Sequence, residues 1–424
     1  FFRCCVPVLG PGDSLLDQAT NLTSEPRLAS FSHLSADSPC RASGRPNPFV
    51  PETSDIDGEP WAAARSIGCD EYISGSVTGE VRVAISASFS KATIGTSLDF
   101  QANINGRVNG SVWDFGDGTV VTNRPVATHA WTKAGQYEVV LRAYNETYPS
   151  GIASTGIVQI ASQATHYVSL NNPSPEWPFA SWETAATNIQ DAVDAVDAAG
   201  ALILVSNGVY ETGIRTVCGR SNRLAITKPV TVRSVNGPGV AVIRGYQETP
   251  GASSAAGVRG VYLANNAVLS GFTIRDGSIN GTFMYDSGGG AWCEPWAVLT
   301  NCVLRDNVAS YNAGGVYQGT LNDCTLIGNS VNNYGGAAYC ATLNNCTIVS
   351  NSASFGAGAA ASLLKACKIL TNSAIQGGGC AISTLEKCMV MGNNARSRGG
   401  GLYGSTANNC VILGNSASYG GGAW

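Results

Sequence analysis

Residues 299–342 read LTNCVLRDNVASYNAGGVYQGT and then LNDCTLIGNSVNNYGGAAYCAT, two successive copies of one pattern. The pattern returns every 21 or 22 residues with a cysteine, at Cys302, Cys324, Cys346, Cys367, Cys388 and Cys410. An asparagine stands five residues after each cysteine, at Asn307, Asn329, Asn351, Asn372, Asn393 and Asn415, with glycine pairs or triplets beyond most of them. A period this short predicts one coil of a stacked β-solenoid rather than a helical hairpin.

The residues around each cysteine predict columns inside the solenoid. A leucine lies three residues before most of the cysteines and an aliphatic residue two residues after each, as in Leu299 and Leu304 around Cys302. Residues two apart share a strand face, and stacked coils lie about 4.8 Å apart. We therefore expect a buried column of mostly reduced thiols, with a strained disulfide ladder or metal binding as alternatives. The asparagines suit bends, where their amides can hydrogen-bond up the column, so both columns are interpreted as structural.

A third column is aromatic. It comprises Trp292, Tyr317, Tyr339, Tyr403 and Trp424, each directly after a small or aliphatic residue, and it is interrupted at Ala360 and Ile382. Because strand neighbours point to opposite faces, these rings are expected to point outward. Such a ledge could stack on sugar rings or on a partner protein, and the alternative is that the rings cover one another.

Residues 166–424 resemble the right-handed parallel β-helix of pectin-lyase-like proteins. The resemblance rests on ATNIQDA at 186–192, VSNGVY at 205–210, ITKPVTV at 226–232 and VLSGFTI at 268–274. An amphipathic helix over residues 187–199 is expected to cap the first coil, with Thr187 and Gln190 at capping-box spacing and Gly200 as the stop.

Residues 80–161 are predicted to form a small β-sandwich, because alternating runs such as 136–142 indicate half-buried strands. This segment closely resembles the PKD domain through one motif: Trp113, Asp114, Phe115, Gly116, Asp117 and Gly118. Two aspartates in a turn favour backbone contacts over catalysis, and His129 is interpreted as a core or turn histidine. In that family the module is a spacer or interaction unit.

Residues 1–73 resemble the closing segment of bacterial surface β-helix proteins of the choice-of-anchor type. The shared pieces are the SPC element at 38–40, DIDG at 55–58 and the IGCDE stretch at 67–71. The resemblance implies an earlier β-helix before this segment, and makes Cys40 and Cys69 candidates for a disulfide that sequence alone cannot assign. We expect the chain to be a fragment, because it begins Phe1-Phe2-Arg3 and stops within a repeat.

Composition narrows the class of protein. Charged residues are 13% of the 424, the formal net charge is −4 and 51 residues are glycine, which suits an all-β extracellular protein. Neither a nucleic-acid partner nor a transmembrane segment is expected, since the charge is small and no apolar run approaches about 18 residues.

These observations predict an all-β chain in which a PKD-type, Ig-like sandwich precedes a right-handed parallel β-helix. We interpret it as a non-catalytic, extracellular or bacterial cell-surface protein that contacts polysaccharide or another surface protein. No cofactor, catalytic residue or metal site is predicted. A polysaccharide lyase or glycoside hydrolase is the first alternative, with its active coil outside or at the edge of this chain, and a structural stalk is the second. A glycosidase needs two carboxylates about 5 to 10 Å apart, and the repeats form no acidic column, since Gly328 and Ser350 occupy the position of Asp306.

Overall fold

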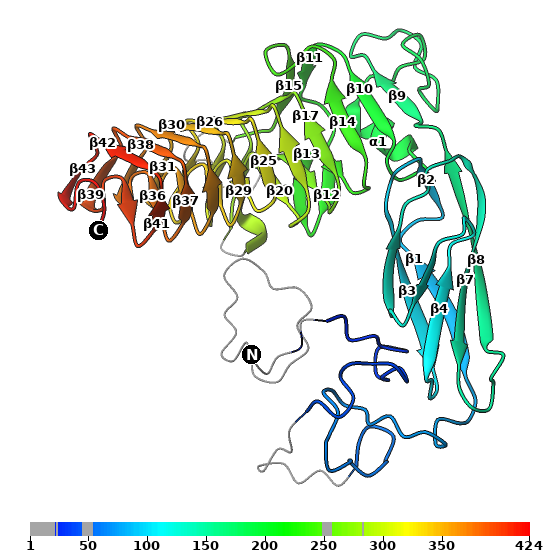
Figure 1. Ribbon diagram of the computed structural model, residues 1–424. Coiled ribbons are helices and arrows are strands. Elements are labelled where there is room, and N and C mark those ends of the chain that lie inside the picture. Colours follow the sequence, from blue (N-terminus) through cyan, green and yellow to red (C-terminus); the bar gives the residue numbers. More distant parts are fainter. Residues whose placement is uncertain (1–21, 23, 45–53, 248–256, 282–283) are drawn as a thin grey trace. The chain divides into compact units, whose positions relative to one another are not determined.

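The computed structural model describes residues 22, 24–44, 54–247, 257–281 and 284–424. The chain divides into two compact units, Phe1–Ser162 and Gln163–Trp424. The predicted first segment therefore shares a unit with the sandwich. Figure 1 shows the chain from its blue N-terminal unit to its red C-terminal coils.

The sandwich consists of a three-stranded and a five-stranded sheet, in the orders β1-β3-β6 and β2-β8-β7-β4-β5. Its strands are β1 (Arg82–Ala87), β2 (Lys91–Thr93), β3 (Leu98–Asn105), β4 (Gly110–Asp114), β5 (Val120–Thr122), β6 (Val126–His129), β7 (Gly135–Tyr144) and β8 (Ile152–Ala161). Four aromatic residues fill the space between the sheets: Phe100, Trp113, Phe115 and Trp131 are each at most 1% exposed. The two indoles donate to backbone carbonyls, so their polar N–H groups are satisfied in the core.

The aspartates of the sandwich motif serve the turn. Asp114 accepts the N–H of Gly116 at 2.9 Å, and Asp117 accepts the N–H of Thr119 at 3.0 Å. Asp117 also contacts His129 Nε2 at 2.8 Å, and the His129 ring stacks on Phe115 with centroids 4.4 Å apart. These contacts hold the β4–β5 connection against the core.

Described residues before β1 carry only isolated bridges, Leu28 with Leu34 and Ser54 with Pro60, so polar contacts hold this segment. The suggested Cys40–Cys69 disulfide is absent from the structure, which has both residues as free cysteines. Cys40 is buried, whereas the Cys69 thiol is directed to the carbonyl of Ser32 at 3.6 Å.

A short helix, α1 (Ile189–Ala195), covers the first coil of the second unit. It is shorter than the predicted 187–199 at both ends: Asn188, rather than Thr187, is the N-cap and accepts the N–H of Gln190 at 2.9 Å, and Val196, with an extended backbone, is the C-cap. The Gln190 side chain instead binds the backbone of Ala225: its Oε1 accepts the N–H at 2.8 Å and its Nε2 donates to the C=O at 3.1 Å. At the other end, Lys228 Nζ donates to the carbonyls of Val193 and Asp194. The helix thus satisfies groups that the solenoid's starting edge would otherwise expose.

The rest of the second unit is a right-handed parallel β-helix, as predicted, whose coils contribute strands to four sheets. Sheet I has ten strands: β9 (Thr165–Val168), β10 (Leu202–Val205), β14 (Thr231–Ser234), β17 (Val268–Ser270), β21 (Val298–Thr300), β25 (Thr320–Asn322), β29 (Thr342–Asn344), β33 (Leu363–Lys365), β37 (Thr384–Glu386) and β41 (Thr406–Asn408). Sheet II has nine: β11 (Gly208–Tyr210), β15 (Ala241–Arg244), β18 (Thr273–Arg275), β22 (Val303–Arg305), β26 (Thr325–Ile327), β30 (Thr347–Val349), β34 (Lys368–Leu370), β38 (Met389–Met391) and β42 (Val411–Leu413).

Sheets III and IV complete each coil. Sheet III has seven strands: β19 (Ser278–Ile279), β23 (Val308–Ala309), β27 (Ser330–Val331), β31 (Ser352–Phe355), β35 (Ser373–Gln376), β39 (Asn394–Arg398) and β43 (Ser416–Tyr419). Sheet IV has nine: β12 (Arg215–Val217), β13 (Arg220–Ile226), β16 (Arg259–Leu263), β20 (Ala291–Cys293), β24 (Val316–Tyr317), β28 (Ala338–Tyr339), β32 (Ala359–Ala360), β36 (Cys380–Ala381) and β40 (Leu402–Tyr403). A short 3-10 helix, η1 (Met284–Asp286), precedes β20.

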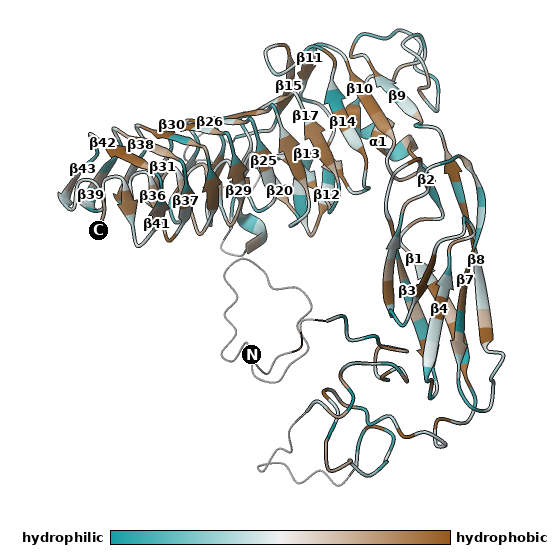
Figure 2. Cartoon of the chain, viewed as in Figure 1, coloured by the Kyte–Doolittle hydropathy of each residue, from teal (hydrophilic) through white to brown (hydrophobic). Residues whose placement is uncertain are grey.

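The interior of the β-helix is built from in-register columns. Leu299 pairs with Leu321 and then Leu343 on sheet I, and Leu304 pairs with Leu326 and then Ile348 on sheet II, all 0% exposed. Figure 2 shows hydrophobic, brown stretches in the strands of successive coils. Burying each such side chain contributes roughly 1.5–3 kcal/mol.

The cysteines occupy the corner between sheets I and II. Five of the six are at most 3% exposed, Cys410 is half-buried, and all six are free. Cys346 illustrates their contacts: its thiol lies 3.3 Å from the carbonyl oxygen of Asn344 and 3.6 Å from that of Leu321. The column therefore behaves as a set of small, buried apolar groups with weak S–H donors.

The asparagines form a continuous hydrogen-bonded ladder at the corner between sheets II and III. Asn351 Oδ1 accepts the backbone N–H of Asn329 at 2.9 Å and its Nδ2 at 3.0 Å, while Asn351 Nδ2 donates to Asn372 Oδ1 at 2.9 Å. The bend at this corner does not fall on the asparagines themselves. Positive φ falls on the residue before each one: Asp306, Gly328, Ser350, Thr371, Gly392 and Gly414. The bend thus belongs to the preceding residue, which leaves the asparagine side chain free to point inward.

Candidate functional site

The aromatic column lies on sheet IV and is longer than the sequence suggested. Tyr262 precedes it, stacked on Trp292 with ring centroids 5.3 Å apart and planes 6° apart. Trp292 stacks on Tyr317 at 5.6 Å, and Tyr317 stacks on Tyr339 at 6.0 Å. The column stops at Ala360 and Ala381, which pair in register with Tyr339 and Tyr403.

Trp292 and Tyr317 follow the second of the two alternatives offered by the sequence, in which the rings cover one another. Trp292 is 9% exposed and Tyr317 is 6% exposed, and Tyr285 of η1 lies across Trp292 at 5.8 Å. The spacing of parallel strands, about 4.8 Å, suits face-to-face contact, so each ring occupies the faces of its neighbours. At the far end, Tyr403 stacks on Trp424 at 5.3 Å, and Trp424 is 54% exposed with the Arg398 guanidinium 4.3 Å above it. The column therefore contributes mainly to stability.

A buried arginine anchors the segment that covers the column. Arg259 is 2% exposed and donates to the carbonyls of Gly288 at 3.0 Å and Ser287 at 3.1 Å, and to Asn222 Oδ1 at 2.8 Å. Burial lowers the pKa of the Arg259 guanidinium to about 10. Asp286 is fully buried and ion-paired with Arg220. Sequence reasoning missed this group because its members are not spaced at the repeat period.

A charged cleft of about 400 Å³ lies beside the first coils, a feature the sequence did not indicate. It is lined by Glu211, Arg223, Arg244, Gly245, Tyr246, Gln247 and Asp276. Arg244 at the end of β15 bridges the two acids, with NH1 3.2 Å from Glu211 and Nε 2.9 Å from Asp276. These ion pairs raise the pKa of Arg244, so the guanidinium stays charged. Tyr246 is 50% exposed and adds an aromatic face to this polar wall.

The cleft continues as a column of arginines along sheet II. Arg244 pairs in register with Arg275, which pairs with Arg305. Both of these arginines are ion-paired with an aspartate: Arg275 lies 3.4 Å from Asp276, and Arg305 lies 2.8 Å from Asp306. The paired charges present many hydrogen-bond donors and acceptors in a fixed array.

A second hollow, of about 290 Å³, lies on sheet III. Its hydroxyl residues include Ser330, Ser352, Ser354 and Ser373, with Arg396 at its rim. Ser352 Oγ donates to Ser330 Oγ at 2.9 Å, so these hydroxyls already bond to one another.

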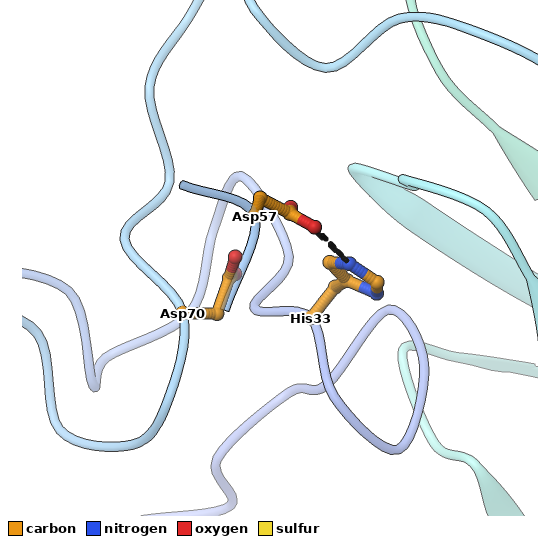
Figure 3. A group of neighbouring side chains, drawn as sticks. All are labelled: His33, Asp57 and Asp70. Carbon is orange, nitrogen blue, oxygen red and sulfur yellow. Dashed lines mark hydrogen bonds and ion pairs between the residues drawn. The ribbon is translucent and has the colours of Figure 1, made fainter. Parts of the chain in front are cut away.

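In the first unit, three side chains approach one another closely: His33, Asp57 and Asp70 (Figure 3). Their potential ligand atoms all lie within 4.8 Å of one another, and they are the only His, Cys, Asp or Glu group of this kind within the described residues. His33 had no role in the sequence-based prediction.

Comparison with known proteins identifies the family of the sandwich segment. Residues 83–155 match the PKD domain family. Among solved structures, a β-sandwich carbohydrate-binding module is similar over 23% of this chain with 23% identity and a TM-score of 0.18, and the chain spans only 39% of that protein. A pectin methylesterase mutant in complex with a hexasaccharide matches over 60% of this chain and 82% of its own, with 14% identity and a TM-score of 0.32.

A family 28 exopolygalacturonase of Yersinia enterocolitica matches over 81% of this chain and 98% of its own, with 8% identity and a TM-score of 0.23. No curated protein matches the sequence. Within the described ranges, no helix has the length and apolarity needed to cross a bilayer. The chain thus contains a segment that matches the PKD domain family, followed by a parallel β-helix.

Proposed function

We propose that this chain is a non-catalytic extracellular or cell-surface protein that contacts polysaccharide through its β-helix, with the PKD domain as a spacer or interaction module. PKD domains are typical of extracellular proteins, which supports the location. The single observation that carries the proposal is the cleft of about 400 Å³ bounded by Arg244, Asp276 and Tyr246. This place differs from the aromatic ledge that the sequence suggested.

The chemistry of the cleft suits sugar hydroxyls. Carboxylates accept hydrogen bonds, guanidinium groups donate several in a fixed fork, and an aromatic face packs against the apolar face of a pyranose ring. Arg223 is oriented by hydrogen bonds from its Nε to the carbonyl of Arg244 at 2.7 Å and from NH1 to that of Gly213 at 2.5 Å. A pocket of this size with a few fixed polar groups is the usual form of a small-ligand site.

Hydrolysis at the same place is the second candidate, because Glu211 and Asp276 flank one guanidinium. A glycosidase needs one of its two carboxyl groups protonated, to act as general acid. In this cleft both carboxylates are already ion-paired with Arg244, at 3.2 and 2.9 Å, so we favour binding over hydrolysis.

The test is binding of the full chain to a glycan array and to soluble polysaccharides, followed by calorimetry with the best ligand. We expect R244Q and Y246A to weaken binding about tenfold or more, as loss of a charged hydrogen-bonding group or a stacking ring costs at least ~1.4 kcal/mol. K387A, which removes another surface ion pair of the β-helix with Glu386, is the matched control. Unchanged affinity in both cleft variants would overturn the proposed site, and release of reducing ends would favour the hydrolase.

A further inference from the structure

Three loops of the first unit bring one imidazole and two carboxylates together. His33 follows a tight turn, Asp57 lies in the DIDG loop and Asp70 lies in the IGCDE stretch. His33 Nε2 is 3.3 Å from Asp57 Oδ2, and all three potential ligand atoms lie within 4.8 Å of one another. His33 and Asp57 are half-buried and Asp70 is buried, so water reaches only one side of the group.

We propose that His33, Asp57 and Asp70 bind a divalent transition-metal cation of the zinc type, with the remaining coordination positions taken by water. One imidazole and two carboxylates form a nitrogen and oxygen ligand set that zinc accepts, whereas calcium and magnesium prefer oxygen alone. With bonds of about 2.0–2.2 Å, ligand atoms of a tetrahedral site lie about 3.4 Å apart. The His33–Asp57 separation of 3.3 Å already matches that value, and Asp70 lies within 4.8 Å of both.

The groups behind the three ligands already orient them. His33 Nδ1 lies 2.8 Å from Ser30 Oγ and 3.1 Å from Ser32 Oγ, which fixes the ring and directs Nε2 to the site. Asp57 Oδ2 accepts a hydrogen bond from Arg107 Nε at 2.9 Å. Outer contacts of this kind hold metal ligands in place in known sites.

Asp70 supplies an independent indication that something is bound there. It is 5% exposed, and Oδ2 accepts the N–H of Leu34 at 2.7 Å. Across the described residues, no hydrogen bond to its other carboxylate oxygen is present. A cation would add a partner of opposite charge to this largely buried carboxylate.

The acidic residues around the three side chains also favour a bound cation. Asp55, Asp57, Glu59, Asp70 and Glu71 gather in this region, and Arg107 is ion-paired with Asp57 and Glu59. Asp55 and Glu71 are satisfied by backbone N–H groups and by Ser66. A divalent cation would neutralise the excess negative charge around Asp70.

A bound metal would also stabilise the fold of this segment, whatever the protein binds elsewhere. Its described residues contain isolated bridges rather than strands, and they contribute few side chains to a core. Segments of this kind commonly depend on metals or disulfides for stability, and the Cys40–Cys69 disulfide is absent. This inference departs from the sequence-based expectation of no metal site.

The experiment uses the full chain, stripped with a chelator and titrated with Zn²⁺ near neutral pH in competition with a chromophoric chelator. We expect one tight equivalent per chain, an affinity about 100-fold lower in H33Q and D70N, and unchanged affinity in H129Q. His129 is the matched control because it also pairs with an aspartate, Asp117, but without a third ligand. Zinc should raise the melting temperature of the wild type but not of H33Q.

X-ray absorption on the zinc-loaded wild type keeps the test decisive even if a variant folds poorly. We expect nitrogen and oxygen scatterers at about 2.0–2.1 Å and no sulfur at about 2.3 Å. Sulfur ligands would assign the zinc to the exposed thiols of Cys69, Cys218 or Cys340 and overturn the proposal. So would an absence of tight binding, or equal affinity in the wild type and both ligand variants.

Discussion

Replacing Asn351 by alanine tests whether the asparagine ladder stabilises the β-helix. The substitution removes the acceptor of two buried donors, the N–H and Nδ2 of Asn329, and the amide that donates to the carbonyls of Leu326 and Val349 and to Asn372 Oδ1. Asn351 is 1% exposed, so water cannot replace these partners in the folded chain.

The cost can be estimated from the two donors alone. A buried donor left without a partner costs about 1–3 kcal/mol, so N351A should destabilise its coils by about 2–6 kcal/mol. The matched control is N344A. Asn344 belongs to the same coil but is half-buried, and its amide donates only to Asn322 Oδ1 at 2.9 Å. Loss of that single bond should cost about 0.5–1.5 kcal/mol.

Amide hydrogen exchange is the suitable assay because a solenoid can open coil by coil, which denaturation midpoints would average. In N351A the amide of Asn329 should exchange at least about 30-fold faster than in the wild type, from the lower bound of ~2 kcal/mol. Amides of the sandwich should be unaffected. If N351A and N344A show equal protection at Asn329, the reasoning about buried amides is refuted.

Three further outcomes follow from the structure. Y317A should destabilise the β-helix by about 3–5 kcal/mol in chemical denaturation, since the ring is buried in a stack, and should leave polysaccharide affinity unchanged; a selective loss of binding would restore the ledge. Site-resolved alkylation of the native chain should label Cys69, Cys218 and Cys340 and should spare Cys346 until denaturant is added; early labelling of Cys346 would contradict its burial. Burial pushes the pKa of Asp117 up, but its bonds with His129 and Thr119 lower it overall, so Asp117 contributes stability above its unfolded pKa of about 3.9 that is lost as pH falls through the lower folded value. Thermal melts from neutral to acidic pH should therefore show a smaller acid loss in D117N than in the wild type, and parallel curves would count against this contribution.

The β-helix could be predicted from the sequence because the residue pattern repeats with the same period as the structural coils. A residue type that returns every 21 or 22 positions must fall on the same place in each coil, so the thiol and amide columns could be read directly from Cys302 and Asn307 onward. The outward direction of the side chains in the aromatic column could also be inferred from the sequence. The burial of these rings could not be inferred, because Trp292 is covered by Tyr285, which lies in an irregular segment outside the repeat.

The charged cleft escaped prediction for a related reason. Arg244, Arg275 and Arg305 share one register position, yet they belong to the longer early coils, where the short period is absent. Only Arg305 lies in the regular part, directly before its ion-pair partner Asp306 in the sequence. The His33 group depends on contacts between loops 24 and 37 residues apart, which no periodicity encodes. The helix cap moved from Thr187 to Asn188 because Gln190 pairs with Ala225, a tertiary contact that overrides a local signal.

The amide ladder has a direction. From Asn307 to Asn415 every bond between two side-chain amides runs the same way, with the Nδ2 group of one coil donating to the Oδ1 atom of the next. Side-chain dipoles aligned in this manner add together and polarise one another. The amide ladder therefore adds an electric polarity along the axis of the solenoid, positive toward the later coils and negative toward the earlier ones. Aligned peptide groups polarise an α-helix by the same mechanism, although there the positive end is the N-terminus.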